Sequence, residues 1–244
     1  VGRDALGSNT TGANNSGFGD QALVNNTTGD RNAAFGNGSM GANTTGQYNT
    51  GFGQNTLALN TTASNNTAVG EASLNQNTTG TDNVAVGKEA LNANTTANNN
   101  TAIGVTALLA NTEGYSNTAV GQSSLKANTT GNNNTAVGRT ALFANTTGSN
   151  NVAVGINALD AQTTANYNTA VGNGSLGANT TGDRNVALGY EAMFTNTVGD
   201  RSVAIGMQAL YSQNPSSNAD MNNIAIGHSS AFNTTTGTNN TAVG

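Results

Sequence analysis

A two-residue motif, one apolar residue followed by glycine, recurs along the whole sequence at a fixed spacing. The spacing is 17 residues everywhere except between Gly206 and Gly227, where it is 21. A fixed period of this length is typical of a solenoid, in which each repeat forms one coil stacked on its neighbours. Because no break in the pattern marks a boundary, we expect residues 1–244 to form a single solenoid of about fourteen repeats, a fragment of a longer chain. The motif glycines stand at positions 2, 19, 36, 53, 70, 87, 104, 121, 138, 155, 172, 189, 206, 227 and 244.

Each repeat is numbered here from its motif glycine as position 0, and a coil is named by that glycine. The unit reads G-x-x-[A/S]-L-x-x-N-T-T-G-x-x-N-T-A-V. Position 16 is always large and apolar, and position 4 is Leu or Met in every coil but the last. In a short strand, positions 14 and 16 point to one side and position 15 to the other. We therefore predict that positions 4 and 16 are buried.

Position 15 is only ever Ala or Gly, as in Gly17, Ala68 and Ala136. A row of such small residues indicates that something packs closely against that side of the strand. The residues alone do not identify this neighbour, and the family resemblance described below implies that it is another copy of the chain. Replacing Ala119 and Ala136 with Leu should then weaken assembly.

The repeat predicts an all-β fold, a parallel β-solenoid or β-roll of 17-residue coils. A helix of useful length does not fit between two glycines and an Asn-Thr-Thr-Gly segment, since Gly, Asn and Thr are poor helix formers. Short strands separated by turns fit the same pattern well. Stacked coils would place Val69, Val86 and Ile103 in one row about 4.8 Å apart.

The composition indicates how such a polar chain is held together. Val, Leu, Ile and Phe make up only about a sixth of the sequence, too little for an ordinary thick core. Asparagine contributes 44 residues and is concentrated at positions 7 and 13. Side-chain amides repeated at the strand spacing can donate to one neighbouring copy and accept from the other. We therefore predict asparagine ladders with a structural role.

Several classes of function are not expected. The chain has no Cys and one His, His228, so neither a thiolate site nor a His-paired metal site can form. Seven Lys and Arg residues with a net charge of −5 argue against a nucleic-acid partner. No apolar run is long enough to insert into a membrane. We expect no enzyme, no catalytic residue, no cofactor and no metal.

Two further motifs receive a structural interpretation. Gly36-x-Gly38-x-x-Gly41 and Gly172-x-Gly174-x-x-Gly177 match the dinucleotide-binding fingerprint. No helix is expected to follow either one, so neither is predicted to bind a cofactor. The Asp-Arg pairs at positions 11 and 12 are interpreted as solvated turn residues; they are Asp30-Arg31, Asp183-Arg184 and Asp200-Arg201.

The segment 207–227 forms an irregular repeat with a four-residue insertion and the only proline, Pro215. If the strands keep register, the excess must leave the stack within residues 214–222. Loops on rigid scaffolds often bind partners, so this loop is the candidate binding site. Its residues are Asn214, Pro215, Ser216, Ser217 and Asn218.

The Asn-Thr-Thr segment also matches the acceptor sequence for N-glycosylation. A turn motif would produce the same residues, so a glycan and a purely structural role are both open. The candidate asparagines are Asn26, Asn43, Asn60, Asn77, Asn94, Asn128, Asn145 and Asn179.

The segments Asn-Thr-Ala-Val-Gly at 66–70, 134–138 and 168–172 and Asn-Val-Ala-Val-Gly at 83–87 and 151–155 resemble a motif of trimeric autotransporter adhesin heads. Those heads are left-handed parallel β-rolls. The longer unit is also similar to repeats of bacterial surface proteins and of phage tail fibres that end in a chaperone domain. The resemblance implies a homotrimer, located at the cell surface, outside the cell or in a virion fibre, with a cell-surface or matrix receptor as a further partner. We therefore expect a structural or adhesive fibre segment.

Two alternatives belong to other classes. The stacked threonines at Thr10, Thr27 and Thr44 could form the hydroxyl lattice of an ice-binding β-solenoid, although consecutive threonines lie in a turn. The chain could also be a subunit of a self-assembling extracellular filament, since no distinct capping repeat is visible.

Overall fold

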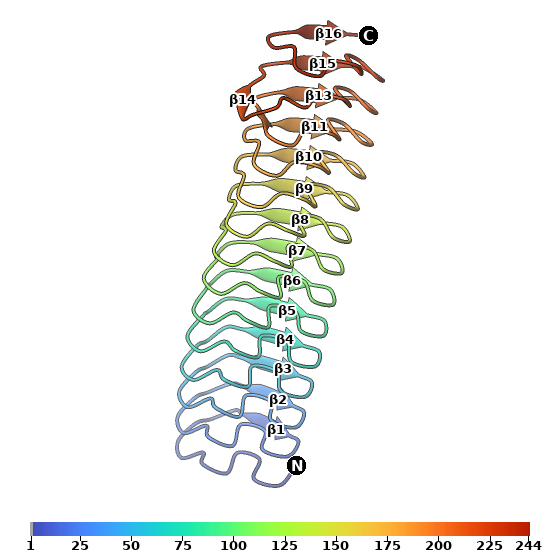
Figure 1. Ribbon diagram of the computed structural model, residues 1–244. Helices are drawn as coiled ribbons and strands as arrows, with labels where there is room; N and C mark the ends of the chain where they lie inside the picture. Colours follow the sequence, from blue (N-terminus) through green and yellow to red (C-terminus); the bar gives the residue numbers. More distant parts are fainter. Residues whose placement is uncertain (1) are drawn as a thin grey trace. The chain divides into compact units, whose positions relative to one another are not determined.

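The computed structural model describes residues 2–244, and none of these residues is helical. The chain is an all-β parallel β-solenoid with coils of about 17 residues (Figure 1). The fold class predicted from the repeat is thereby confirmed. Two compact units, Val1–Asn117 and Thr118–Gly244, are described separately as unit 1 and unit 2.

Unit 1 contributes one three-residue strand per coil, always at positions 14 to 16. Neighbouring strands pair in parallel between residues 17 apart, so that Val69 lies beside Val86 and Val86 beside Ile103. This is the row predicted from the sequence. The strands are β1 (Ser16–Phe18), β2 (Ala33–Phe35), β3 (Thr50–Phe52), β4 (Thr67–Val69), β5 (Val84–Val86) and β6 (Thr101–Ile103).

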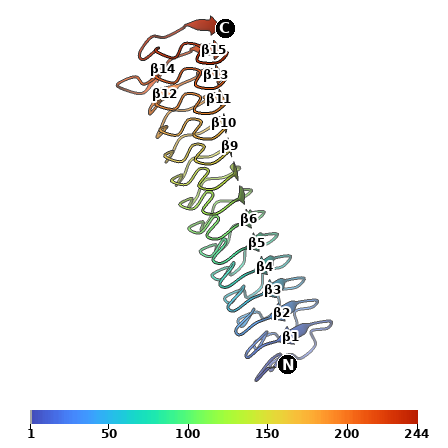
Figure 2. The same ribbon diagram turned by 90° about the vertical axis from the view of Figure 1, so that its right-hand side faces the viewer.

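Unit 2 repeats this arrangement and adds a two-stranded parallel sheet, β12 with β14, beside the irregular coil (Figure 2). The main strands stay in register across the insertion, since Ile205 of β13 pairs with Ile226 of β15. The strands are β7 (Thr118–Val120), β8 (Thr135–Val137), β9 (Val152–Val154), β10 (Thr169–Val171), β11 (Val186–Leu188), β12 (Gly199–Asp200), β13 (Val203–Ile205), β14 (Ala219–Asp220), β15 (Ile224–Ile226) and β16 (Thr241–Val243).

The side of the strand that faces the core is opposite to the one predicted. Position 15 is fully buried inside the coil, as in Ala68 and Ala136, whereas position 16 points outward and leaves Val69 37 % exposed. The predicted alternation of the strand is correct, but the prediction that position 16 is buried is wrong. The small residues at position 15 therefore pack within one chain, and they cannot form the contact between copies that the sequence suggested.

The narrow cross-section of the coil explains this orientation. A Cβ atom built on Gly17 would lie 3.3 Å from Leu6 Cγ, and one on Gly51 would lie 3.1 Å from Met40 Cε. Position 15 thus faces position 4 across the core, and only Ala or Gly leaves room for the Leu or Met side chain. Burial of position 4 was predicted correctly. The largest fully buried side chains all come from this position: Leu23, Met40, Leu57, Leu74, Leu91, Leu108, Leu125, Leu142, Leu159, Leu176, Met193 and Leu210.

The motif glycine is required by the backbone at the corner that follows each strand. Gly36 has a φ of 138°, in a region that residues with side chains rarely adopt. A Cβ atom at this position would also lie 2.3 Å from the carbonyl oxygen of Gly53 in the next coil. The repeat therefore keeps glycine here because two backbones approach closely.

Two buried asparagine ladders replace most of the missing apolar core. At position 7, Asn77 Nδ2 donates to Asn60 Oδ1 at 3.0 Å and to the carbonyl of Gly80 at 2.9 Å. At position 13, the backbone amide of Asn49 donates to Asn32 Oδ1 at 2.9 Å. Both rows are fully buried along most of the chain, and the predicted structural ladders are confirmed.

Candidate functional site: the outward strand face and the irregular coil

The outward side chains at positions 14 and 16 form a surface that we call the strand face. In unit 1 it carries the exposed apolar residues Phe18, Phe52 and Ile103, which are 40 to 48 % exposed. Threonine stands at position 14 beside many of them, as in Thr50 and Thr101. The strand face therefore combines apolar groups with methyl and hydroxyl groups at the regular strand spacing.

Three phenylalanines continue as a ladder at position 16 of β1, β2 and β3. The ring centroids of Phe18 and Phe35 are 4.9 Å apart, and those of Phe35 and Phe52 are 4.3 Å apart. The rings are stacked within 11° of parallel. Stacking stabilises the row but leaves its outer edge in solvent, since Phe18 is 48 % exposed.

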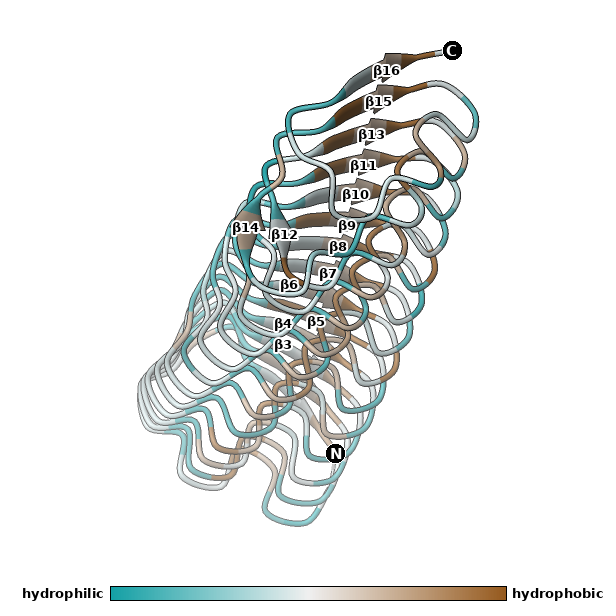
Figure 3. Ribbon diagram, turned by 45° about the horizontal axis from the view of Figure 1, so that its top comes forward, coloured by the Kyte–Doolittle hydropathy of each residue, from teal (hydrophilic) through white to brown (hydrophobic). Residues whose placement is uncertain are grey.

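The strand face of unit 2 is also apolar. Ile205, Ile224 and Ile226 are each about 40 % exposed although they belong to regular strands. Figure 3 shows β13 and β15 coloured toward the hydrophobic end, whereas the turns that precede them are hydrophilic. Contiguous exposed apolar surface of this kind is typical of interaction sites. Sequence reasoning missed it because the large residue at position 16 was assigned to the core.

The candidate glycosylation sites are incompatible with this fold. Asn26, Asn43, Asn60, Asn77, Asn94, Asn128, Asn145 and Asn179 are all fully buried. In Asn43, the side-chain nitrogen donates both to Asn26 Oδ1 at 2.8 Å and to the carbonyl of Gly46 at 3.1 Å. A glycan on this nitrogen would remove a ladder donor and would have no space inside the coil. The structure therefore argues against glycans at these positions and supports the alternative reading as a structural segment.

The irregular coil places its insertion within the predicted range. Gln213 Nε2 still donates to Asn196 Oδ1, 17 residues earlier, whereas Ala219 pairs with Gly199 and Ile224 with Val203. Three of the four additional residues therefore lie between Gln213 and Ala219, and the fourth lies between Asp220 and Ile224.

Only part of the candidate binding loop projects from the stack. Pro215 is buried, and a Cβ atom on Gly199 would lie 3.1 Å from its Cδ. Asn214 Oδ1 accepts a hydrogen bond from Thr197 Oγ1 at 2.7 Å. Asn214 is exposed but, like the buried Pro215, it is tied to the neighbouring coil, and the exposed residues that follow are Ser216, Ser217 and Asn218.

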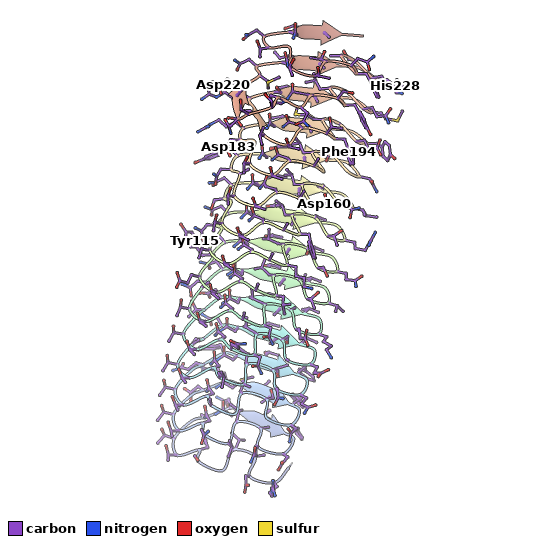
Figure 4. The ribbon with its side chains drawn as sticks, in the orientation of Figure 1. Tyr115, Asp160, Asp183, Phe194, Asp220 and His228 are labelled. Atoms are coloured by element: carbon purple, nitrogen blue, oxygen red, sulfur yellow. The ribbon has the colours of Figure 1, made fainter. Side chains whose placement is uncertain are left out.

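The aspartates of the Asp-Arg pairs cap backbone groups of the preceding coil. Asp183 Oδ1 accepts from the amide of Asn166 at 2.6 Å, and Asp200 Oδ1 accepts from the amide of Asp183 at 2.7 Å. Burial raises the pKa of Asp200 above its ordinary value, and the neighbouring Asp183 and Asp220 carboxylates add to this effect. Figure 4 shows Asp183 and Asp220 at one edge of unit 2. The hydrogen bonds of Asp183 and Asp200 to backbone amides give these aspartates a structural role.

The arginines of these pairs contact side chains one coil away instead of their own aspartates. The Arg31 guanidinium lies 5.2 Å from the centroid of the Tyr48 ring, and that of Arg184 lies 5.6 Å from the Tyr167 centroid. Arg201 pairs with Asp220 of the next coil. His228 is exposed.

No cluster of three or more metal-ligating side chains occurs among residues 2–244. In the same range, no helix is long and apolar enough to cross a membrane. Comparisons of the chain with protein-family models, with curated proteins and with solved structures return no match.

Proposed function

We propose that the chain is a structural and adhesive segment of an extracellular or virion fibre, in which three copies associate through their strand faces. The observation that supports this proposal is the exposed apolar strand face, with Phe18, Phe52 and Val69 in unit 1 and Ile205 and Ile226 in unit 2. Burying such a surface between copies would add the apolar burial that each narrow coil lacks. The three-fold state follows the resemblance to trimeric adhesin heads.

The proposal moves the contact between copies from position 15 to positions 14 and 16. Position 15 is enclosed by its own coil, so its residues cannot meet a partner. Positions 14 and 16 offer branched and aromatic side chains on stiff strands. Such side chains lose little conformational freedom when they pack against another copy.

The mass of the full chain in solution tests the proposal. A trimer has three times the chain mass of 24.3 kDa by light scattering or sedimentation equilibrium. A double variant, Val69→Lys with Ile205→Lys, should dissociate because it places charges in the apolar contact. Thr79→Lys with Thr147→Lys adds the same charge on exposed turns and should remain trimeric. A monomeric parent chain, or equal masses for both double variants, would contradict the proposed interface.

The ice-binding alternative receives less support from the predicted threonine rows. The hydroxyls of Thr27 and Thr44 donate to the carbonyls of Thr44 and Thr61 in the next coils, at 3.0 Å each. Hydroxyls used in this way do not form a free lattice. The regular strand face is the surface that such a function would use, and thermal hysteresis of the purified chain distinguishes the two functions.

A further inference from the structure

The Gly172 coil carries a groove in unit 2 that no part of the proposed fibre function uses. Gly174 and Gly177 occupy positions 2 and 5 of this coil, where other coils commonly carry outward side chains. Because these two glycines have no side chains, a groove of about 500 Å³ is open at this point. Asn157 and Asp160 from the preceding coil and Glu191 and Phe194 from the following coil line it. In Figure 4, Asp160 and Phe194 lie along the same edge of unit 2.

Phe194 provides an aromatic surface at one wall of the groove. It begins a ladder of three rings, with its centroid 5.7 Å from that of Tyr211 and Tyr211 4.9 Å from Phe232. Tyr211 covers one face of the Phe194 ring. A Cβ atom on Gly177 would lie 3.0 Å from Phe194 Cε2, so the glycine keeps a side chain off the ring on the groove side.

The groove is negatively charged. Asp160 and Glu191 face it from the two adjoining coils, and no Lys, Arg or His lines it. Partial burial raises the pKa of Asp160, and the nearby backbone amides of Asp160 and Ala161 partly oppose this effect. Glu191 accepts a hydrogen bond from Gln208 Nε2 at 2.9 Å, which orients its carboxylate.

An aromatic face beside two carboxylates is complementary to a flat cation. A guanidinium group can stack on a ring and donate hydrogen bonds from its edge to a carboxylate. We propose that the groove over Gly177 binds a guanidinium group, which stacks on Phe194 and donates hydrogen bonds to Asp160 and Glu191. The site lies at positions 2 and 5, away from the strand face, and does not depend on the proposed function.

The Gly36 coil is an internal control for this inference. It has the same pair of glycines, Gly38 and Gly41, but the following coil supplies Asn55 and Ala58 instead of an acid and an aromatic ring. Asn55 Oδ1 lies 2.6 Å from the point where a Cβ of Gly38 would stand, so the amide covers this glycine. The glycine pattern alone therefore does not create the site, and its flanking residues do.

Titration of the full chain with N-acetylarginine amide tests the proposal. Binding is detected by calorimetry or by changes in the amide chemical shifts of unit 2. The neutral isostere N-acetylcitrulline amide is the matched ligand control. We expect saturable binding of the arginine compound, with a Kd on the order of 1 mM, because one stacked ring and two charge-assisted contacts act together in a groove that is open to solvent. An arginine-containing peptide that binds roughly tenfold more tightly would identify a protein side chain as the source of the guanidinium.

Two variants locate the binding, and a third serves as their control. Gly177→Asn restores a polar side chain at position 5 and should fill the groove, whereas Gly41→Asn makes the same change in the Gly36 coil and should leave binding unchanged. Asp160→Asn keeps the shape of the side chain and should weaken binding roughly fivefold or more by removing a charge-assisted hydrogen bond. Equal affinity for the citrulline compound, binding unaffected by Gly177→Asn, or no saturation by about 10 mM ligand would each overturn the proposal.

Discussion

At the scale of single residues, buried amides carry much of the stability of this fold. Each position-7 asparagine donates to the preceding coil and to its own turn, and accepts from the following coil. Because these groups are fully buried, an amide that loses its partner has no water to replace it. The ladders therefore join coils that a single leucine per coil could hold only weakly.

Asn77→Ala tests the contribution of one ladder residue. The variant removes the donor to Asn60 and to the Gly80 carbonyl, and it removes one of the two acceptors of the Asn94 side-chain nitrogen, which keeps its bond to the Ala97 carbonyl. We expect the free energy of unfolding to fall by about 2 to 4 kcal/mol, measured by urea denaturation. Thr79→Ala, two residues later on the exposed turn, should change it by less than about 0.5 kcal/mol. Similar losses for the two variants would show that the ladder is not the stabilising element.

At the scale of the element, the middle residue of each three-residue strand faces the interior of the coil, and this determines which residues the strand accepts. The outer residues of β8, Thr135 and Val137, are partly exposed, whereas Ala136 between them is fully buried. The coil interior opposite the strand holds the position-4 side chain. The strand therefore tolerates variation on its outer side and almost none on its inner side.

Ala136→Leu should destabilise the single chain. The added side chain would enter space already filled by the position-4 residues, and overpacking of this kind costs about 1 to 3 kcal/mol. Val137→Leu, on the outer side of the same strand, should leave the melting temperature of an isolated chain nearly unchanged. If Ala136→Leu instead preserved stability and altered only the mass in solution, the orientation of β8 described here would be incorrect.

The irregular coil is the second element that a deletion can test. Removing Ser216, Ser217 and Asn218 deletes three exposed residues of the insertion but keeps Pro215 and Met221, which are buried. We expect the variant to fold with an unchanged circular dichroism spectrum, because the register on both sides is set by Gln213 and β15. If the loop binds a receptor, attachment to a surface falls while folding is retained. Loss of cooperative unfolding would show instead that these three residues belong to the stack.

At the scale of the whole molecule, two aspartates with raised pKa values predict that the chain becomes more stable on mild acidification. Burial raises the pKa of both Asp160 and Asp200. An acid whose pKa is higher in the folded state binds its proton more tightly there, so the free energy of unfolding decreases as the pH rises from its unfolded pKa to its folded pKa. Acidification through that range, which begins at about the ordinary value of 3.8, should therefore stabilise the chain.

Thermal unfolding between pH 7 and pH 4, monitored by circular dichroism, measures this effect. The melting temperature of the parent chain should rise on acidification, and Asp200→Asn should have a higher melting temperature at pH 7 and a smaller rise. The amide can still accept the hydrogen bond from the Asp183 backbone. A melting temperature that falls steadily from pH 7 to pH 4, equally in both proteins, would contradict the assignment.

The sequence by itself determined the repeat length, the absence of helices, the strand at positions 14 to 16, the register of the stack and the asparagine ladders. These features are local or strictly periodic, so residues 17 apart carry the information directly. The four additional residues of the irregular coil could also be placed, because the strands on either side, at Ile205 and Ile226, keep the same motif.

Only the tertiary structure decided which side of each strand faces the core. Alternation is the same in both orientations, and the usual preference for burying the larger residue favours the wrong one. The deciding factor is the width of the coil, which admits one Leu or Met from position 4 and leaves space for no more than Ala at position 15. The groove at Gly177 could not be predicted from the sequence either. It depends on side chains from three successive coils, which become neighbours only when the coils are stacked.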